Sequence, residues 1–453
     1  MGMPDVLPAA GAAPPGTILT PMSVTLQRLD LRHLQGALAP HLPRPEIAGA
    51  GPVAAVNAIL AEVREGGDAA VRACTERFDG VTVDQLRIPP AEVAAAVAAI
   101  PAPLREALEA AKASILAFHQ AQLRPEGRYE RDGIVVRELR RAVDRAGLYV
   151  PGGRARYPST VLMTAIPARV AGVAEVVLCV PPEPDGRVNA PTLAAAAIAG
   201  VDEVYRIGGA QAIGALAYGT ETIRPVDVIV GPGSVFVSVA MRIVAQEGRV
   251  GVPSAFAGPS EVVVVADETT PVDAAAIDVI VQAEHGPDGL AWLVTWSEEA
   301  AGAITAAVGR LTEASPRRAE IVSTLEKAGY VVLVATPEQA MEVANAIAPE
   351  HLELMTAEPE RLLPLVRNAG AVFCGVYAPA SVGDYIAGPS HVLPTNGSAR
   401  FASVLRVDDF CKQIHVVSLD RCALARVAPH VAAIAEAEGF AAHAASVRDR
   451  GIA

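Results

Sequence analysis

From about Gly147 onward, short runs rich in Val and Ile alternate with helical segments, and several of these runs end in Gly or Pro. Strand, glycine turn, helix and strand in that order are typical of βαβ units, in which helices cover both faces of a parallel sheet. The predicted strands are Leu148–Val150, Glu175–Pro181, Glu203–Ile207, Asp227–Val230, Glu261–Ala266, Ala291–Trp296, Tyr330–Ala335 and Ala371–Val376. The pattern predicts an α/β fold with parallel-rich sheets.

Helical segments flank this alternating region. Pro52–Phe78 and Pro90–Leu123 carry apolar residues at three- and four-residue spacing, with charges on the other face, which predicts amphipathic helices. After about Phe401, one strand-like run, Ile414–Leu419, precedes Ala-rich helix. This tail is too small to bury a core alone, so we expect it to pack on something else, such as a partner chain.

Composition narrows the class of protein further. The 453 residues are enough for two or three domains of about 150 residues each. The formal net charge of −13 is a poor match for a phosphate backbone, so we expect no nucleic-acid partner. No apolar run approaches the roughly 20 residues of a membrane span, so we expect no membrane partner. Scattered cysteines without a CxxC motif indicate the reducing cytoplasm.

Glycine turns follow some of the predicted strands, at Gly147–Gly153, Ile207–Ile213 and Gly231–Ser234. Glycine lets the backbone approach a ligand closely, and the N-terminus of a following helix favours anionic groups. None of these turns matches GxGxxG, so tight turns in an α/β sheet are the simpler interpretation.

The segment Gln282–Asp288 ends a helical pattern that begins near Val272. Residues three apart lie on one helix face, so Gln282 and His285 can converge on one point, as metal ligands would. A His at a helix C-terminus also stabilises the helix dipole. Spacing alone leaves both interpretations open.

Glu350 and His351 stand just past the predicted helix Pro337–Ile347. The pair suits acid/base chemistry, because His titrates near neutrality and a Glu carboxylate activates water. The alternative is a solvated Glu-His pair on a loop.

The glycine-rich loop Ser381–Thr395 carries Asp384 and His391 and follows the predicted strand Ala371–Val376. Sites in α/β proteins form at the carboxyl ends of strands, and long loops in compact domains are often functional. For this loop we favour a functional role over a merely ordered connection.

Three further polar residues have a simpler interpretation on sequence alone. Ser260, in the segment Ala257–Glu261, either lies in a turn or presents a hydroxyl to a ligand. Gly439 should break the last helix, so Glu438 and His443 either reach into a site or form a solvated helix end.

Together these segments resemble the histidinol dehydrogenase family, in unbroken order from about Gly147 to Val447. The most specific stretches are GLYVPGGRARYPSTVLM, RIGGAQAIGALAYGTETI, AGPSEV, QAEHGPD, APEHLEL, GDYIAGPSHVLPT and EGFAAH. The resemblance implies oxidation of L-histidinol to L-histidine in two NAD+-dependent steps, through bound L-histidinal.

The resemblance also implies roles for single residues, with one zinc ion in each subunit. The implied zinc ligands are Gln282, His285, Asp384 and His443. The implied substrate contacts are Ser260, Gln282, His285, His351, Asp384, His391, Glu438 and His443. Glu350 and His351 match the acid/base pair. Tyr149 and Gln211 match residues that touch NAD+, and Ser234 stands near the expected cofactor position.

The implied architecture is two incomplete Rossmann-like domains with a helical N-terminal segment and a helical C-terminal tail. The expected divisions are a flexible leader at 1–22, a discontinuous catalytic and zinc-binding domain at 23–147 and 259–400, an NAD+-side domain at 148–258, and a tail at 401–453. The family forms a homodimer in which the tail packs on the partner subunit and completes its site.

Three departures from the family pattern leave an alternative open. Ala380 stands where many relatives have Glu, Ser234 replaces the usual Asn, and Val252–Phe256 lacks an acidic residue often present there. A paralogue that oxidises another small alcohol, such as a sulfonated diol, would look similar. A non-catalytic zinc-binding scaffold would have lost the Glu-His pair, which this chain retains.

Overall fold

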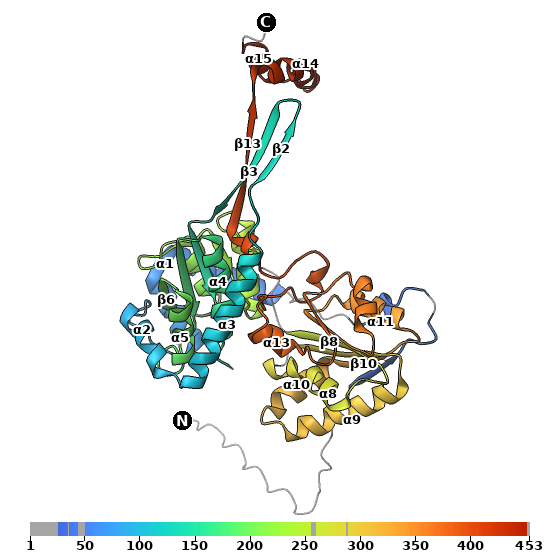
Figure 1. The fold of residues 1–453 in the computed structure, drawn as a ribbon. Coiled ribbons are helices and arrows are strands. Elements are labelled where there is room, and N and C mark those ends of the chain that lie inside the picture. Colours follow the sequence, from blue (N-terminus) through green and yellow to red (C-terminus); the bar gives the residue numbers. More distant parts are fainter. Residues whose placement is uncertain are drawn as a thin grey trace, which may run out of the picture.

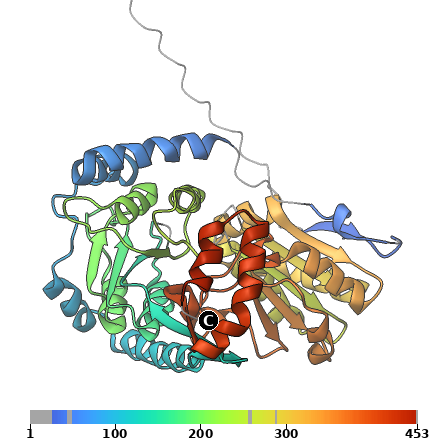
Figure 2. The ribbon, with the colours of Figure 1, turned by 90° about the horizontal axis from the view of Figure 1, so that it is seen from above.

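The structure is a computed structural model that describes residues 26–34, 36–43, 50–153, 155–254, 260–286 and 289–450. The described chain forms two α/β bodies, each with its own sheet, and an arm that carries the last helices away from both (Figure 1). Figure 2 views the molecule along this arm. The predicted α/β class, with parallel-rich sheets and helical terminal segments, is confirmed. Among the described residues, no helix is long and apolar enough to span a bilayer.

The first body is built on a parallel sheet with the strand order β6-β5-β4-β7. Its strands are β4 (Arg145–Tyr149), β5 (Glu175–Val180), β6 (Glu203–Arg206) and β7 (Val228–Val230). Its covering helices are α4 (Pro158–Ala171) and α5 (Ala190–Ala199) on one face, and α6 (Gly209–Tyr218) and α7 (Val235–Gln246) on the other. Because both faces are covered, the strands are apolar runs, as the sequence predicted.

The N-terminal helices also belong to this four-stranded body. Helix α1 (Ala50–Asp79) packs on α6 and α7, whereas α2 (Pro90–Ala99) and α3 (Ala102–Ala121) pack on α4 and α5. This packing differs from the expected grouping of 23–147 with 259–400, because periodicity reveals an apolar helix face but not the sheet that it covers. The other domain boundaries stay predictions, and the leader at 1–22 lies outside the described residues.

Both predicted N-terminal helices are interrupted. The first is kinked within α1 at Gly67, whose φ is 51° and ψ −135°. The second is in fact two helices. The segment Pro90–Leu123 is interrupted at Ile100, whose φ of −90° and ψ of 153° are extended. Pro101 follows, and a residue before proline is driven out of the helical region by the proline ring. Helices α2 and α3 therefore meet at a bend.

The second body is built on a parallel sheet with the order β1-β10-β9-β8-β11-β12. The strands are β1 (Gln27–Asp30), β8 (Glu261–Ala266), β9 (Leu290–Thr295), β10 (Gly329–Leu333), β11 (His351–Met355) and β12 (Ala371–Cys374). One face is covered by α8 (Val272–Val281), α9 (Glu298–Ala314) and α10 (Arg318–Ala328), the other by α11 (Pro337–Ile347) and α12 (Pro359–Leu362). The sequence missed β1, which is polar, and β11, which begins with His351 and contains Glu353.

Short helices occupy several connections. They are η1 (Ala39–His41), η2 (Ala283–His285), η3 (Leu363–Leu365), α13 (Ala380–Tyr385), η4 (Ser398–Arg400) and η5 (Val407–Phe410). Of these, η2 and α13 lie within motifs that the sequence singled out.

The arm is a three-stranded antiparallel sheet followed by two helices. Its elements are β2 (Gly127–Arg131), β3 (Ile134–Ala142), β13 (Cys411–Leu419), α14 (Arg421–Ala437) and α15 (Ala441–Arg448). The two helices pack on each other through Ala432, Ala435 and Ala444. Larger side chains stay exposed: Ile434 is 62% exposed and Phe440 53%. The arm therefore leaves apolar surface uncovered within one chain.

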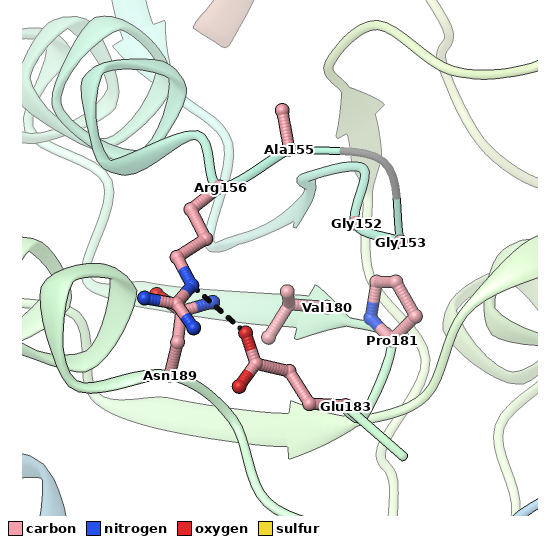
Figure 3. A pocket seen from close by; sticks show the side chains of 8 residues that line it. All are labelled: Gly152, Gly153, Ala155, Arg156, Val180, Pro181, Glu183 and Asn189. Carbon is pink, nitrogen blue, oxygen red and sulfur yellow. Dashed lines mark hydrogen bonds and ion pairs between the residues drawn. The ribbon is translucent and has the colours of Figure 1, made fainter. Parts of the chain in front are cut away.

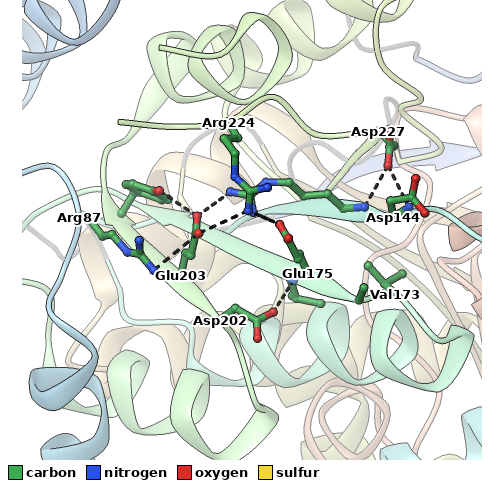
Figure 4. A network of polar contacts seen from close by, with 12 residues as sticks. Arg87, Asp144, Val173, Glu175, Asp202, Glu203, Arg224 and Asp227 are labelled. Atoms are coloured by element: carbon green, nitrogen blue, oxygen red, sulfur yellow. Dashed lines mark hydrogen bonds and ion pairs between the residues drawn. The ribbon is translucent and has the colours of Figure 1, made fainter. Parts of the chain in front are cut away.

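A buried ion cluster ties the strands of the four-stranded body together (Figure 4). The Arg145 side chain is 7% exposed, and its guanidinium donates to the carboxylates of Glu175 and Glu203, with Nη2 2.5 Å from Glu203 Oε2. Burial opposes the charge of Glu203, but hydrogen bonds from Arg145 and Tyr205 outweigh it and lower the pKa of Glu203. The cluster is thus ionised at neutral pH.

Replacing Arg145 with Met is expected to lower the free energy of unfolding by about 3–5 kcal/mol, because the largely buried Glu203 carboxylate would lose its closest partner and keep only the longer contacts with Arg87 and Arg224. Urea denaturation monitored by circular dichroism measures the loss. Arg224→Met is the matched control: Arg224 also contacts Glu175 but is 64% exposed, so its loss should cost less than about 1 kcal/mol. Equal losses in the two variants would contradict the assignment.

Candidate active site

Glu350 and His351 lie at the amino end of β11, where they are 7% and 2% exposed. His351 Nδ1 is 3.0 Å from the carbonyl oxygen of Glu261, the first residue of the neighbouring strand β8. The carbonyl can only accept, so Nδ1 carries a proton and Nε2 is the nitrogen available for proton exchange. The alternative of a solvated pair on a loop is therefore wrong.

The carboxylate of Glu350 is held by β8, the strand whose first residue also contacts His351. Its Oε2 accepts a hydrogen bond from the backbone N–H of Glu261 at 2.9 Å and lies 3.4 Å from His351 Nδ1. Burial opposes the charge on the His351 ring, but the carboxylates of Glu350 and Asp384 outweigh it and hold its pKa well above the usual value. The pair is thus an electrostatically coupled unit.

Glu261 is a site residue that the sequence analysis missed. It holds Glu350 and His351 through its backbone, and its Oε1 accepts the backbone N–H of Asn396 at 2.8 Å. Burial, followed by the nearby Glu350 carboxylate, raises the pKa of Glu261 to about 8. A carboxyl group at the start of an otherwise apolar strand was the signal that could have identified it.

Asp384 joins this cluster from α13. Its Oδ1 is 3.1 Å from His351 Nε2, and its Oδ2 is 3.4 Å from Nε2 of Gln282, which caps the C-terminus of α8. Helix α8 runs antiparallel to the strands it connects, so its last residue lies at their amino ends. The loop was expected to place Asp384 at the carboxyl end of its strand. Instead, α13 turns back and brings it beside the first residue of β11.

Two histidines connect the cluster with the four-stranded body. The ring of His391 lies between the Asp384 carbonyl, 2.8 Å from Nδ1, and the Thr160 hydroxyl of α4, 2.9 Å from Nε2. The ring of His285 stacks on Tyr157, which precedes α4, with centroids 6.2 Å apart. The candidate site therefore lies where the two bodies meet.

The remaining predicted site residues lie partly at this junction and partly in the arm. Ser260 immediately precedes β8, although the Ala257–Pro259 part of its motif lies outside the described residues. Glu438 and His443 lie at the end of α14 and in α15, far from α13 (Figure 1). Within one chain, the described residues contain no group of three His, Cys, Asp or Glu side chains arranged to hold a metal ion.

The residues predicted to contact NAD+ lie at the carboxyl edge of the four-stranded sheet. Tyr149 ends β4, Gln211 is in the first turn of α6, and Ser234 precedes α7. Tyr149 is 4% exposed, and its hydroxyl oxygen accepts the backbone N–H of Gly209 at 3.1 Å, at the start of α6. Gln211 is 1% exposed, so Ser234 is the only exposed residue of these three.

A pocket of about 160 Å³ opens at the same edge (Figure 3). The backbone of Gly152 and Gly153 forms one side, and Arg156 forms another, with Nε 3.0 Å from Glu183 Oε1. A Cβ at position 152 would lie 2.6 Å from Pro181 Cγ, so the close approach of the two turns requires glycine there. Glycine backbone and a guanidinium at a strand's carboxyl end suit an anionic ligand.

Comparison with known proteins points to one family. The histidinol dehydrogenase family profile matches residues 43–451. Histidinol dehydrogenase of Geobacillus kaustophilus is 48% identical over 397 residues, which cover 87% of this chain and 93% of that protein. The Methanothermobacter thermautotrophicus protein of the same name is 45% identical over 402 residues, or 88% and 93% of the two chains. The crystal structure of histidinol dehydrogenase from Elizabethkingia anophelis has a TM-score of 0.88 and 33% identity, and the match covers 94% of this chain and 98% of that one.

Proposed function

We propose, because the chain belongs to the histidinol dehydrogenase family, that it oxidises L-histidinol to L-histidine, the last steps of histidine biosynthesis, with NAD+ as hydride acceptor. The observation that carries this proposal is the buried cluster of Glu350, His351 and Asp384 at the junction of the two bodies. A base, a water-activating carboxylate and an adjacent crevice for a nucleotide are the parts that alcohol and aldehyde oxidation require.

In the first step, neutral His351 accepts the hydroxyl proton at Nε2 while the carbinol carbon transfers hydride to NAD+, which leaves the aldehyde. Glu350 then takes a proton from water as the water oxygen attacks the aldehyde carbon, and protonated His351 returns its proton to the former carbonyl oxygen, which gives the hydrate and the neutral ring. The hydrate loses a second hydride to another NAD+, and His351 again accepts the hydroxyl proton. Each histidinol thus consumes one water and two NAD+. Burial of the site keeps the reactive aldehyde away from solvent.

We propose that zinc is held by Gln282, His285 and Asp384 of one chain and by His443 of a second chain. Imidazole and carboxylate are usual ligands of Zn²⁺ and an amide oxygen is an infrequent one, and the contact between Gln282 and Asp384 supports the proposal. When bound, zinc would hold nitrogen atoms of the substrate and so orient its alcohol carbon. Ser260, His391 and Glu438 are the proposed further contacts of the substrate.

Replacing Gln282 or His285 with Ala should lower zinc content and activity together, because each change removes one of the four proposed ligands. Metal analysis of the purified protein, beside its dehydrogenase activity, measures both. Gln339→Ala on α11 is the matched control, since its side chain only accepts the backbone N–H of Ala335. Unchanged zinc stoichiometry in both ligand variants would refute the assignment.

NAD+ is proposed to lie along the carboxyl edge of the four-stranded sheet, past Ser234 and the glycine-lined pocket. Tyr149 and Gln211 would form the floor of this site, because both are buried, Tyr149 at the end of β4 and Gln211 in the first turn of α6. This edge of the sheet faces the junction with the other body, which supports transfer of hydride from a substrate at the junction to NAD+.

The proposed assembly is a homodimer in which the arm of each chain reaches the site of the other. Uncovered apolar side chains support a second copy as the occupant. They lie on the arm and around α13, where Tyr377 is 98% exposed, Tyr385 59% and Ile386 40%. This arrangement brings Glu438 and His443 to the other zinc and substrate residues.

The test of the reaction is NADH formation with L-histidinol, compared with a panel of small alcohols that includes a sulfonated diol. Two NADH per L-histidinol are expected. The panel is needed because Ala380 stands where many relatives have Glu, so this chain lacks that carboxylate. Ala380 is fully buried, and its backbone N–H donates to Glu353. NADH formation with another alcohol, but not with L-histidinol, would overturn the substrate and favour the paralogue.

A further inference from the structure

A second pair of buried acidic side chains lies behind the candidate site. Asp278 of α8 is 7% exposed and Glu353 of β11 is 2% exposed, and their carboxyl groups lie close enough to interact directly. Glu353 follows His351 by two positions, so the two side chains share one face of β11. Asp278 precedes Gln282 by four positions, which is one turn of helix. The proposed mechanism uses neither acid.

The pair also contacts the element that carries Asp384. Oε1 of Glu353 accepts the backbone N–H of Ala380, the first residue of α13, at 2.9 Å. Asp384 stands four residues further along this short helix. The two carboxyl groups therefore connect β11, α8 and α13, the elements that bear His351, Gln282 and Asp384.

Two buried carboxyl groups in contact cannot both be ionised at low cost. Among the described residues, Oε2 of Glu353 has no donor unless a proton stands between it and Asp278. Burial, followed by the charge of Asp278, raises the pKa of Glu353 to about 9, and burial also raises the pKa of Asp278. At neutral pH the pair thus holds one proton, which joins α8 to β11.

We propose that Asp278 and Glu353 are positioning residues that set the separation of Gln282 and Asp384 across His351. The inference rests on the proposed metal site, since it assigns the pair to the arrangement of those ligands. Without the pair, α8 and α13 would keep their apolar packing but would lose the polar link that fixes their ends relative to β11.

The test is titration of the metal-free full-length protein with Zn²⁺. Glu353→Leu leaves Ala380 N–H and Asp278 without their partner, and we expect Zn²⁺ affinity to fall by about 10- to 100-fold, as for other changes behind metal ligands. Glu353→Gln keeps an acceptor for Ala380 and gains a donor for Asp278, so its affinity should stay within about threefold of wild type.

The matched control is Asp68→Leu, which also replaces a buried carboxyl group with an apolar side chain. Asp68 is 6% exposed in the four-stranded body, where its Oδ1 accepts the Thr220 hydroxyl at 2.5 Å. Its loss should lower the melting temperature without changing Zn²⁺ affinity. An equal loss of affinity in this control would overturn the inference, because general destabilisation would then explain the result.

The pH dependence of the melting temperature gives a second readout, which apolar packing would not change. Folding raises the pKa of Glu353 from its ordinary 4.5 towards about 9, so its contribution to stability is present at low pH and is lost as pH rises through this window. The charged groups that face Glu353 are Asp278 and His351, while its neighbours in the sheet, Val264 and Phe373, are apolar. Glu353→Gln and Asp278→Asn should therefore flatten the decline in melting temperature with pH.

The outcomes separate the two proposals. Wild-type Zn²⁺ affinity in Glu353→Leu would overturn the positioning role. If Glu353→Leu does not fold, the dependence of melting temperature on pH decides. A decline with pH as steep as that of the wild type in both Glu353→Gln and Asp278→Asn would overturn the positioning role. Absence of Zn²⁺ binding by the wild-type protein would overturn the proposed metal site itself, and the positioning role with it.

Discussion

His351→Asn is expected to lower kcat with L-histidinol by about 10²- to 10⁴-fold, the usual contribution of a general base. Asn keeps a donor for the Glu261 carbonyl, but its amide cannot accept the hydroxyl proton at the place of Nε2. Zinc content should stay unchanged, because His351 is not among the four proposed ligands. Steady-state NADH formation and metal analysis of the same preparation measure both quantities.

The pH profile adds a specific signature. His351 is the proposed base, and only its neutral ring accepts a proton. The activity of the wild type should therefore rise with pH as this group loses its proton, and the residual activity of His351→Asn should lack that limb. His119→Asn is the matched control, because His119 is also buried with Nδ1 on a carbonyl oxygen, 2.8 Å from Ile115 O. Full activity in His351→Asn would exclude its role as the base.

Loss of the end of the tail is expected to abolish activity, although it leaves both α/β bodies intact. A chain that stops before Val427 lacks Glu438 and His443, and His443→Ala removes only one proposed zinc ligand. Both variants should be inactive alone. Co-expression of either with His351→Asn should restore about a quarter of wild-type activity, since half of randomly formed dimers are mixed and each mixed dimer has one intact site.

The control for this experiment uses two lesions in the same body. Co-expression of Glu350→Gln with His351→Asn should restore nothing, because every site in a mixed dimer then carries one of the two lesions. Restored activity in this control would show that active enzyme arises by a route other than sites shared between subunits. No restoration with the tail variants would argue for a site completed within one chain, and would contradict the shared assembly.

Much of the fold could be predicted because its strands are buried on both faces. Continuous β-branched runs such as Glu261–Ala266 coincide with the observed strand β8, and a glycine or proline marks many of their ends. Strand β11 escaped notice because it turns His351 and Glu353 towards α8 while Leu352 and Leu354 face the opposite core. A strand that carries site residues does not have an apolar pattern.

The candidate site, like the fold, could be predicted only in part. Local motifs named Gln282, Glu350, His351 and Asp384 as chemically suited side chains, and the family resemblance supplied their proposed roles. Motifs do not reveal which residues touch. That Asp384 lies beside the first residue of β11, and that Glu261 holds Glu350 and His351 through its backbone, depends on strand register and on the turn before α13.

The sequence by itself determined the α/β class, the polar side chains available for chemistry and a tail too small to form its own core, because these depend on local periodicity and composition. Only the tertiary structure decided which sheet the N-terminal helices cover, that the acidic and histidine side chains gather at the amino ends of β8 and β11, and that Tyr149 and Gln211 are buried. Those properties arise from contacts between segments distant in sequence, and a hydrophobic or polar pattern in one segment does not specify its partner.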